Sequence, residues 1–214
     1  MRYKLRKNEA DEVMDILFKT YPDARAELNF TNPFELLIAT ILSAQCTDVR
    51  VNLTTKDLFR LYPGPEELSK AKLEDVENIV KKCGLYKTKA KNIIGTSKIL
   101  VEEYQSKVPD NLEALVKLPG VGKKTANVVV SNAFGRPAIA VDTHVFRVSN
   151  RLGLAHARDV LKTESDLQKI LDKDKWSKSH HTLIFHGRRT CKARKPQCEE
   201  CTVKDYCLFY GRKR

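Results

Sequence analysis

The feature that most constrains the fold is a group of cysteines near the C-terminus. Four of the six cysteines are Cys191, Cys198, Cys201 and Cys207, so the chain has to bring four thiols to one place. In a reducing compartment such a group indicates a metal centre rather than disulfides. Zinc knuckles usually have two close pairs of ligands, whereas only one pair is close here. The uneven spacing therefore favours an iron–sulfur cluster over zinc.

The charge of the chain indicates a polyanionic partner. Lysine and arginine number 39 against 27 acidic residues, which gives a net charge of +12 and a pI near 9.4. Neutralising phosphates releases condensed counterions, so this excess favours nucleic acid, although a surface charged for solubility is the alternative. Lys192, Arg194 and Lys195 lie between the first two clustered cysteines, where a metal would hold them in a rigid basic loop.

No segment predicts membrane insertion or secretion. The longest apolar stretch, Leu36–Leu42, is far too short to span a bilayer. The basic N-terminus is followed by the polar residues Asn8–Asp11 instead of an apolar segment, so it is not a secretory signal. We expect an intracellular protein of one large or two small domains.

Nearly every segment has helical periodicity, which predicts an all-α fold. Asn8 can cap a first helix, and Asn32, Pro33 and Glu35 form a strong start for a buried second one. Asp142 can cap a helix that ends near Gly153. Further helices are expected at about 73–82, 87–104, 110–117, 123–134, 164–171 and 176–187.

The segment from Leu118 to Ala126 suits phosphate binding. Gly120 and Gly122 flank Val121, so the backbone can turn tightly there and present N–H groups. The following helix would point its unpaired N–H groups and positive dipole end to the same spot. A plain tight turn is the alternative, and the spacing of a P-loop is missing.

Lys123 and Lys124 are expected in the first turn of that helix. The helix dipole and the adjacent like charge both push an ammonium towards its neutral form, which a Schiff-base nucleophile needs. On a helical wheel Lys124 points away from the apolar side, so it is favoured over Lys123 as the group that faces a cleft. Contact with phosphate or solvent is the ordinary role for both.

Three further residues have ordinary interpretations. Asp142 follows an apolar run and opens a helix, so it is expected as an N-cap, a role that a catalytic one does not exclude. Cys46 and Cys83 have no other cysteines near them in the sequence and are expected to be small core residues.

Taken together, these motifs resemble those of the endonuclease III family of helix–hairpin–helix DNA glycosylases, over nearly the whole chain. The matching segments are Leu42–Asp48, Gly84–Tyr86, Leu118–Thr125, Val141–Val145 and the cysteine pattern. The resemblance implies a six-helix domain at residues 22–135 that contains the helix–hairpin–helix at about 112–131. Residues 1–21 and 136–214 would form the iron–sulfur domain, with its cluster loop at 191–207 and a DNA groove between the two lobes.

The resemblance also implies a chemistry. Lys124 matches a lysine that attacks C1′ of a flipped, oxidised pyrimidine nucleotide, and Asp142 matches an aspartate that assists. The resulting imine drives β-elimination of the 3′ phosphate. Gln45 and Leu85 match residues that fill the gap in the DNA.

Other residues receive roles from the resemblance alone. Ser43, Asp48 and His144 match residues near the lesion pocket, and the four clustered cysteines match the ligands of a [4Fe–4S] cluster. The implied partner is damaged double-stranded DNA, and we expect the protein to act as a monomer in the cytoplasm.

Three alternatives stay open. An adenine glycosylase shares most motifs but has serine or tyrosine at the position of Lys124. The others are a non-catalytic DNA-binding module and a zinc-stabilised RNA-binding protein.

Overall fold

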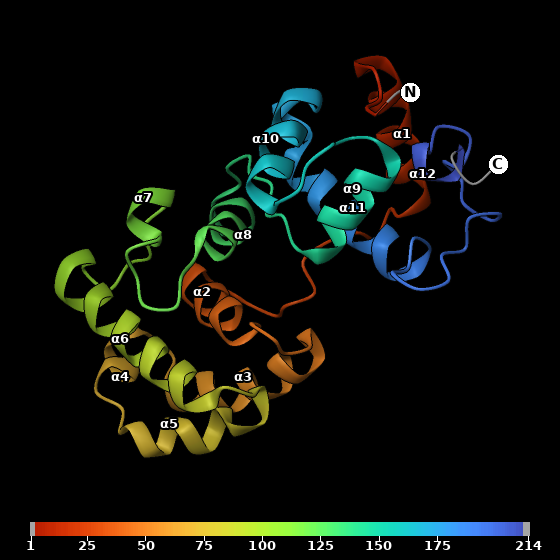
Figure 1. The fold of residues 1–214 in the computed structure, drawn as a ribbon. Coiled ribbons are helices and arrows are strands. Elements are labelled where there is room, and N and C mark those ends of the chain that lie inside the picture. Colours follow the sequence, from red (N-terminus) through yellow and green to blue (C-terminus); the bar gives the residue numbers. More distant parts are fainter. Residues whose placement is uncertain (1–2, 212–214) are drawn as a thin grey trace. The chain divides into compact units, whose positions relative to one another are not determined.

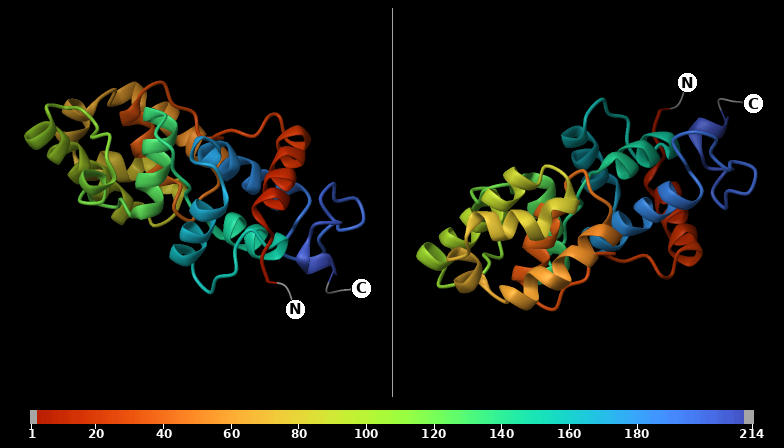
Figure 2. Two further views of the ribbon diagram at one scale, coloured as in Figure 1. Left: turned by 90° about the horizontal axis from the view of Figure 1, so that it is seen from above. Right: turned by 90° about the horizontal axis from the view of Figure 1, so that it is seen from below.

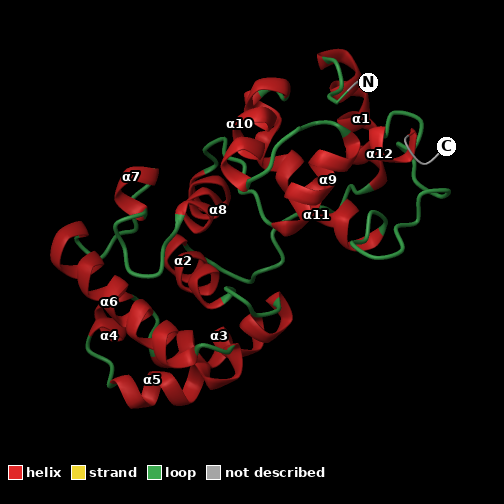
Figure 3. Cartoon of the chain, viewed as in Figure 1, coloured by secondary structure: helices red, strands yellow, loops and turns green. Residues whose placement is uncertain are grey.

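The fold is built from helices and connecting loops. The computed structural model describes residues 3–211, so Met1 and Arg2 of the basic N-terminal segment lie outside the described range. No strand occurs within the described residues (Figure 3), which confirms the all-α prediction. The helices divide into two compact units (Figure 1): one holds residues 26–136, and the other holds the described residues up to Arg25 and from Pro137 onward.

The unit of residues 26–136 is built around the mostly buried helix α2 and the long helix α6, which buries one face. Its helices are α2 (Pro33–Leu42), α3 (Asp48–Leu61), α4 (Pro65–Ser69), α5 (Leu73–Val80), the 3-10 turn η1 (Lys81–Cys83), α6 (Tyr86–Tyr104), α7 (Leu112–Leu115) and α8 (Lys123–Phe134). The predicted start of α2 is confirmed: the Asn32 side chain accepts a hydrogen bond of 2.9 Å from the Glu35 N–H, and Pro33 is the first helical residue. α6 packs against α4 and α5, and α8 packs against α2 and α7.

Helix α3 was not predicted from the sequence pattern. Its buried face includes Thr54 and Thr55 beside Val51 and Leu58, whereas Val49 is 72% exposed. Two of the buried positions are thus polar and some apolar residues lie outside, so the helical periodicity of hydrophobic residues is weak.

The other unit joins the two ends of the chain. It contains α1 (Lys7–Thr20), α9 (Thr143–Leu152), α10 (Val160–Ile170), the 3-10 turn η2 (Lys173–Lys175), α11 (Trp176–Arg189) and α12 (Leu208–Gly211). Both views of Figure 2 show α1, in red, beside the C-terminal segment, in blue, and the hydroxyls of Thr20 and Thr202 lie 3.2 Å apart. The core of this unit includes Val13 and Leu17 from α1 and Leu183 from α11.

The predicted cap of α1 is wrong. The helix begins at Lys7, so Asn8 lies inside it. Arg6 takes the cap position, because its backbone N–H donates to Glu9 at 2.8 Å and its guanidinium donates to the same carboxylate at 2.9 Å. Within the described residues, no helix has the length and apolar character needed to cross a membrane.

Candidate functional site

The turn between α7 and α8 is fixed against α6. Gly120 has φ +75°, and a β-carbon there would lie 2.7 Å from Nδ2 of Asn92, so both the backbone conformation and the close approach require glycine. Thr96 donates a hydrogen bond of 2.9 Å to the Pro119 carbonyl. Val121 is buried beneath the turn. The helix–hairpin–helix is therefore a rigid part of its unit.

The N-terminus of α8 is open. Gly122 occupies the cap position with φ −88°, and no side chain caps the helix, whereas side chains cap α2, α3, α7, α9 and α10. No atom lies within 4 Å of the place where a Gly122 β-carbon would stand. The fold itself therefore does not require this glycine, and another molecule can approach the helix end closely.

Two lysines follow this opening. Lys123 and Lys124 are both exposed in the first turn of α8, while Ala126 and Val129 are buried on its other side. Lys124 forms no hydrogen bond or ion pair with any described residue. Its amine is therefore held only by its own stem and can reach an incoming molecule.

Asp142 caps α9, as the sequence predicted. Its Oδ1 accepts a hydrogen bond of 2.8 Å from the Val145 N–H, and the residue is half-buried. No described residue donates to its second carboxylate oxygen, Oδ2, which leaves that oxygen available for chemistry. In the same helix, Nδ1 of the half-buried His144 lies 3.3 Å from Nη2 of Arg147.

Gln45 and Leu85 share a rare backbone conformation. Neither is glycine, yet Gln45 has φ 54° and Leu85 has φ 47°, and both side chains are exposed. The two segments are linked, because Arg50 donates to the Lys82 carbonyl at 3.4 Å. Strained, exposed residues of this kind mark functional sites more often than packing sites.

Near Gln45, two other residues singled out by the resemblance close helix ends. Ser43 follows α2, and its hydroxyl donates to the Thr40 carbonyl at 2.8 Å. Asp48 is the first residue of α3, directly after the capping residue Thr47.

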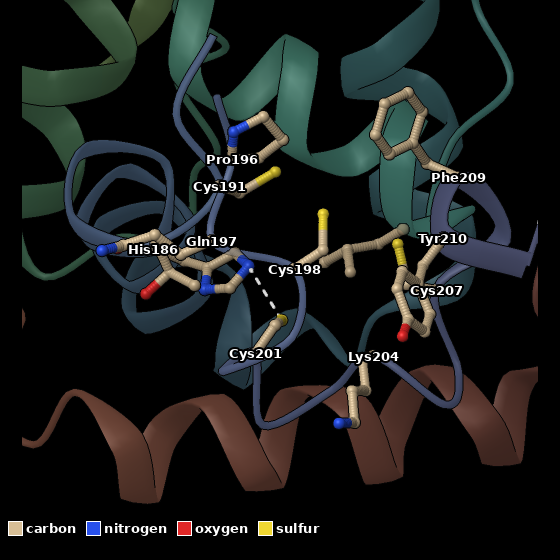
Figure 4. A pocket seen from close by; sticks show the side chains of 12 residues that line it. His186, Cys191, Pro196, Gln197, Cys198, Cys201, Lys204, Cys207, Phe209 and Tyr210 are labelled. Atoms are coloured by element: carbon tan, nitrogen blue, oxygen red, sulfur yellow. Dashed lines mark hydrogen bonds between the residues drawn. The ribbon is translucent and has the colours of Figure 1, made fainter. Parts of the chain in front are cut away.

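The four clustered cysteines surround one cavity. Figure 4 shows their sulfur atoms around the same space, and the residues that line this pocket include all four cysteines together with Leu152, Pro196 and Phe209. Within residues 3–211, no three histidine, cysteine or acidic side chains come close enough to bind a single metal ion. Four cysteine thiols around one space are the donor set that a [4Fe–4S] cluster requires.

Two nitrogen donors approach the cysteine sulfurs. Arg151 Nη1 lies 3.6 Å from the Cys191 sulfur, and His186 Nε2 lies 3.9 Å from the Cys201 sulfur. Burial lowers the pKa of His186 to about 4, and its Nδ1 lies 3.0 Å from the Tyr21 hydroxyl. The sequence pattern did not predict these contacts, because both residues lie in helices outside the cysteine loop. Such partners stabilise thiolates and tune a cluster.

Hydrogen bonds from α9 hold the backbone of the basic loop between the first two cysteines. Arg151 donates to the Lys192 carbonyl at 2.8 Å and to the Ala193 carbonyl at 3.1 Å. The side chains of Lys192, Arg194 and Lys195 are exposed, and Lys195 has φ 50°. A fixed backbone thus presents three cations to solvent.

Family models match this chain in two regions. Residues 38–173 match the HhH-GPD superfamily base excision DNA repair proteins. Residues 191–207 match the iron–sulfur binding domain of endonuclease III.

Individual relatives agree with these matches. Endonuclease III of Bacillus subtilis is 52% identical, over 94% of this chain and 92% of the relative, and that of Escherichia coli is 47% identical over 92% and 94%. A solved structure of a trapped covalent endonuclease III–DNA intermediate has a TM-score of 0.92 and 49% identity, and the match covers 98% of this chain and 99% of that one. The chain therefore belongs to the endonuclease III family of helix–hairpin–helix base-excision repair proteins.

Proposed function

We propose that this DNA glycosylase and AP lyase excises oxidised pyrimidines, with Lys124 as its nucleophile. The observation that carries this role is an exposed lysine, at the open end of α8, that has no hydrogen-bond partner within residues 3–211. Its Nζ attacks C1′ of the damaged nucleotide, the bond from C1′ to the base breaks, and the base leaves with a proton. The C1′–O4′ bond then breaks and O4′ takes the remaining proton of the nitrogen, which opens the sugar ring and gives an imine. Loss of a C2′ proton breaks the C3′–O bond and releases the 3′ phosphate.

Asp142 is proposed to assist this chemistry while it caps α9. Its Oδ1 is occupied by the Val145 N–H, and Oδ2 has no partner among the described residues. A carboxylate in this state can take or give a proton and can stabilise positive charge that develops on the sugar. The structural and chemical roles thus use different oxygens.

Gln45 and Leu85 are proposed to fill the gap that the flipped nucleotide leaves. Their exposed side chains stand on two linked segments of the same unit, which supports a joint role. Oxidised pyrimidines stack poorly, so extruding them costs less than extruding a normal base. We further propose that Ser43, Asp48 and His144 line the lesion pocket.

Phosphate binding is assigned to two surfaces. The hairpin residues Gly120 to Lys123 offer N–H groups and a helix dipole, and Lys192, Arg194 and Lys195 offer cations on an anchored loop. Neutralising one contacting cation should lower the slope of log affinity against log salt by about one unit. An unchanged slope for all three loop cations would place the DNA path elsewhere.

The protein carries a [4Fe–4S] cluster, and we propose Cys191, Cys198, Cys201 and Cys207 as its ligands. These four residues would hold the cluster within the C-terminal loop, and its binding energy would contribute to folding. Replacing any of the four ligands should therefore damage folding first.

The functional domains are proposed at residues 22–135 and at 1–21 with 136–214, a few residues from the compact units. We also propose that the protein acts as a monomer in the cytoplasm on double-stranded DNA. Light scattering at assay concentration tests the monomer directly.

The deciding experiment uses duplex DNA that carries a thymine glycol. We expect release of the damaged base and a strand break with a 3′ unsaturated aldehyde. Duplex DNA with adenine opposite 8-oxoguanine is the matched control and should stay intact. Release of adenine from the control duplex alone would indicate an adenine glycosylase. Binding of DNA without any product would indicate a non-catalytic module.

A further inference from the structure

Lys89, in the second turn of α6, is an unusually buried lysine. Only 3% of the residue is exposed, and burial lowers its pKa. No carboxylate among the described residues pairs with it; its electrostatic partners are the thiols of Cys46 and Cys83. Lysines are almost never buried without an ionic partner, because desolvating the ammonium is costly. A specific structural demand has to offset that cost.

The contacts of Lys89 show what it holds. Its Nζ donates a hydrogen bond of 2.6 Å to the Cys83 carbonyl, and its backbone N–H donates one of 3.0 Å to the Leu85 carbonyl. One residue therefore binds the carbonyls on both sides of Gly84.

The turn between these two carbonyls is strained. Gly84 has φ 64° and Leu85 has φ 47°, so two successive residues adopt a backbone conformation that side chains disfavour. The Leu85 side chain is 59% exposed and gains little from packing. Without external hydrogen bonds, this turn would relax to a more common conformation and withdraw the leucine.

The same residue also lies beside the Gln45 segment. The thiol of Cys46, the residue after Gln45, interacts with both the Cys83 thiol and Lys89. Cys83 is further fixed by a contact of 3.5 Å between its sulfur and the Thr54 hydroxyl. Lys89 is thus buried next to both the Gln45 segment and the Leu85 turn, whose side chains project into solvent.

We infer that Lys89 is a positioning residue that keeps Leu85 projecting, so that the leucine enters the DNA as the damaged nucleotide leaves the stack. This inference rests on the gap-filling role proposed above for Leu85. Lys89 itself touches neither DNA nor the reacting atoms and acts only through the turn.

A double-mutant cycle tests this coupling. Lys89→Met keeps the length of the side chain and removes the donor, and kcat/KM is measured on thymine glycol duplex with and without Leu85→Ala. We expect Lys89→Met to lower kcat/KM by about tenfold or more, in line with the strength of hydrogen bonds to charged groups. In the Leu85→Ala background the same change should cost less than about twofold, because coupled residues are not additive.

Two further variants sharpen the cycle. Gly84→Ala meets no atom within 4 Å but strains the turn, so it should reproduce the loss and its dependence on Leu85. Lys91→Met, on an exposed position of α6, is the matched control and should behave as wild type. Fluorescence of a 2-aminopurine placed opposite the lesion reports gap filling directly and should fall with Lys89→Met.

The outcomes separate the two proposals. A Leu85→Ala variant as active as wild type would refute the gap-filling role, and this inference with it. An impaired Leu85→Ala, together with a Lys89→Met effect that is absent or fully additive, would overturn the role of Lys89 alone. A Lys89→Met chain that does not fold at any temperature would also overturn it, because its role would then be general to the core.

Discussion

Asp142 is assigned two roles, and substitutions at this position separate them. Asp142→Ala removes the oxygen that accepts the 2.8 Å hydrogen bond from the Val145 N–H, which is the side-chain cap of α9. Losing such a cap costs about 1 kcal/mol, or about 2–4 °C in Tm for a chain of this size. Asp142→Asn keeps an oxygen at the cap, so its free energy of unfolding should stay within about 0.5 kcal/mol of wild type.

The activity of these variants should depend on the negative charge at position 142 and not on their thermal stability. Both variants lose the carboxylate, so single-turnover base release from thymine glycol DNA should fall by about 100-fold or more in each. Asp159 offers a matched control, because it caps α10 through a 2.8 Å hydrogen bond from the Lys162 N–H and is exposed. Asp159→Ala should lose similar stability and keep full activity.

A fully active Asp142→Asn would refute the catalytic role of this aspartate. If that variant releases base as fast as wild type while Asp142→Ala does not, the aspartate acts only as a cap. Circular dichroism melts of all variants, run in the assay buffer, make the comparison at known stability.

Three other predictions concern the hairpin, the cluster and acid stability. Gly120→Ala should lower the free energy of unfolding by about 1–2 kcal/mol or more, because the new β-carbon strains a residue with positive φ and pushes on Asn92. Gly122→Ala should leave Tm unchanged and weaken DNA binding, because its β-carbon meets no atom of the fold but would meet the DNA. Equal melting temperatures for the two variants would contradict this prediction. The purified protein should be yellow-brown with about four iron and four sulfide per chain, and a colourless, active zinc protein would refute the cluster. Although burial raises the pKa of Asp166, hydrogen bonds from Lys4, the His156 N–H and Lys162 lower it overall. The contribution of Asp166 to the free energy of unfolding is therefore complete above the pKa of an unfolded aspartate, near 3.9, and is lost as pH falls through its lower pKa in the folded state. Denaturant melts of wild type and Asp166→Asn should accordingly differ at pH 7 and converge in strong acid.

Local signals predicted much of the helical framework. The start of α2 and the cap of α9 follow from single residues, Asn32 and Asp142, whose short side chains reach a backbone N–H three residues later. α8 begins at Lys123 and ends at Phe134, as expected, because glycine precedes it and follows it. Tertiary packing determined the rest: α3 places threonines inside, and the Arg6–Glu9 contact moved the start of α1.

The candidate site likewise contains some residues that the sequence pattern identified and others that only the structure or the resemblance singled out. The hairpin glycines and the cysteine group can be identified from the sequence because their residue types are tied to one geometry. Backbone strain at Gln45 and Leu85 leaves no mark in the residue type, so only the resemblance singled them out. The buried Lys89 and the donors Arg151 and His186 have the pattern of ordinary helical residues, and their contacts depend on which elements pack together.

The central claim is that the amine of Lys124 forms a covalent imine with the damaged nucleotide. Borohydride reduces such an imine to a stable bond, so a gel shift of thymine glycol duplex after reduction measures it directly. Lys123→Gln provides the matched control, since it removes the neighbouring amine from the same helical turn. We expect a trapped adduct with wild type and Lys123→Gln and none with Lys124→Gln, although the last variant should still bind the DNA. Trapping by Lys124→Gln, or its loss only in Lys123→Gln, would contradict it.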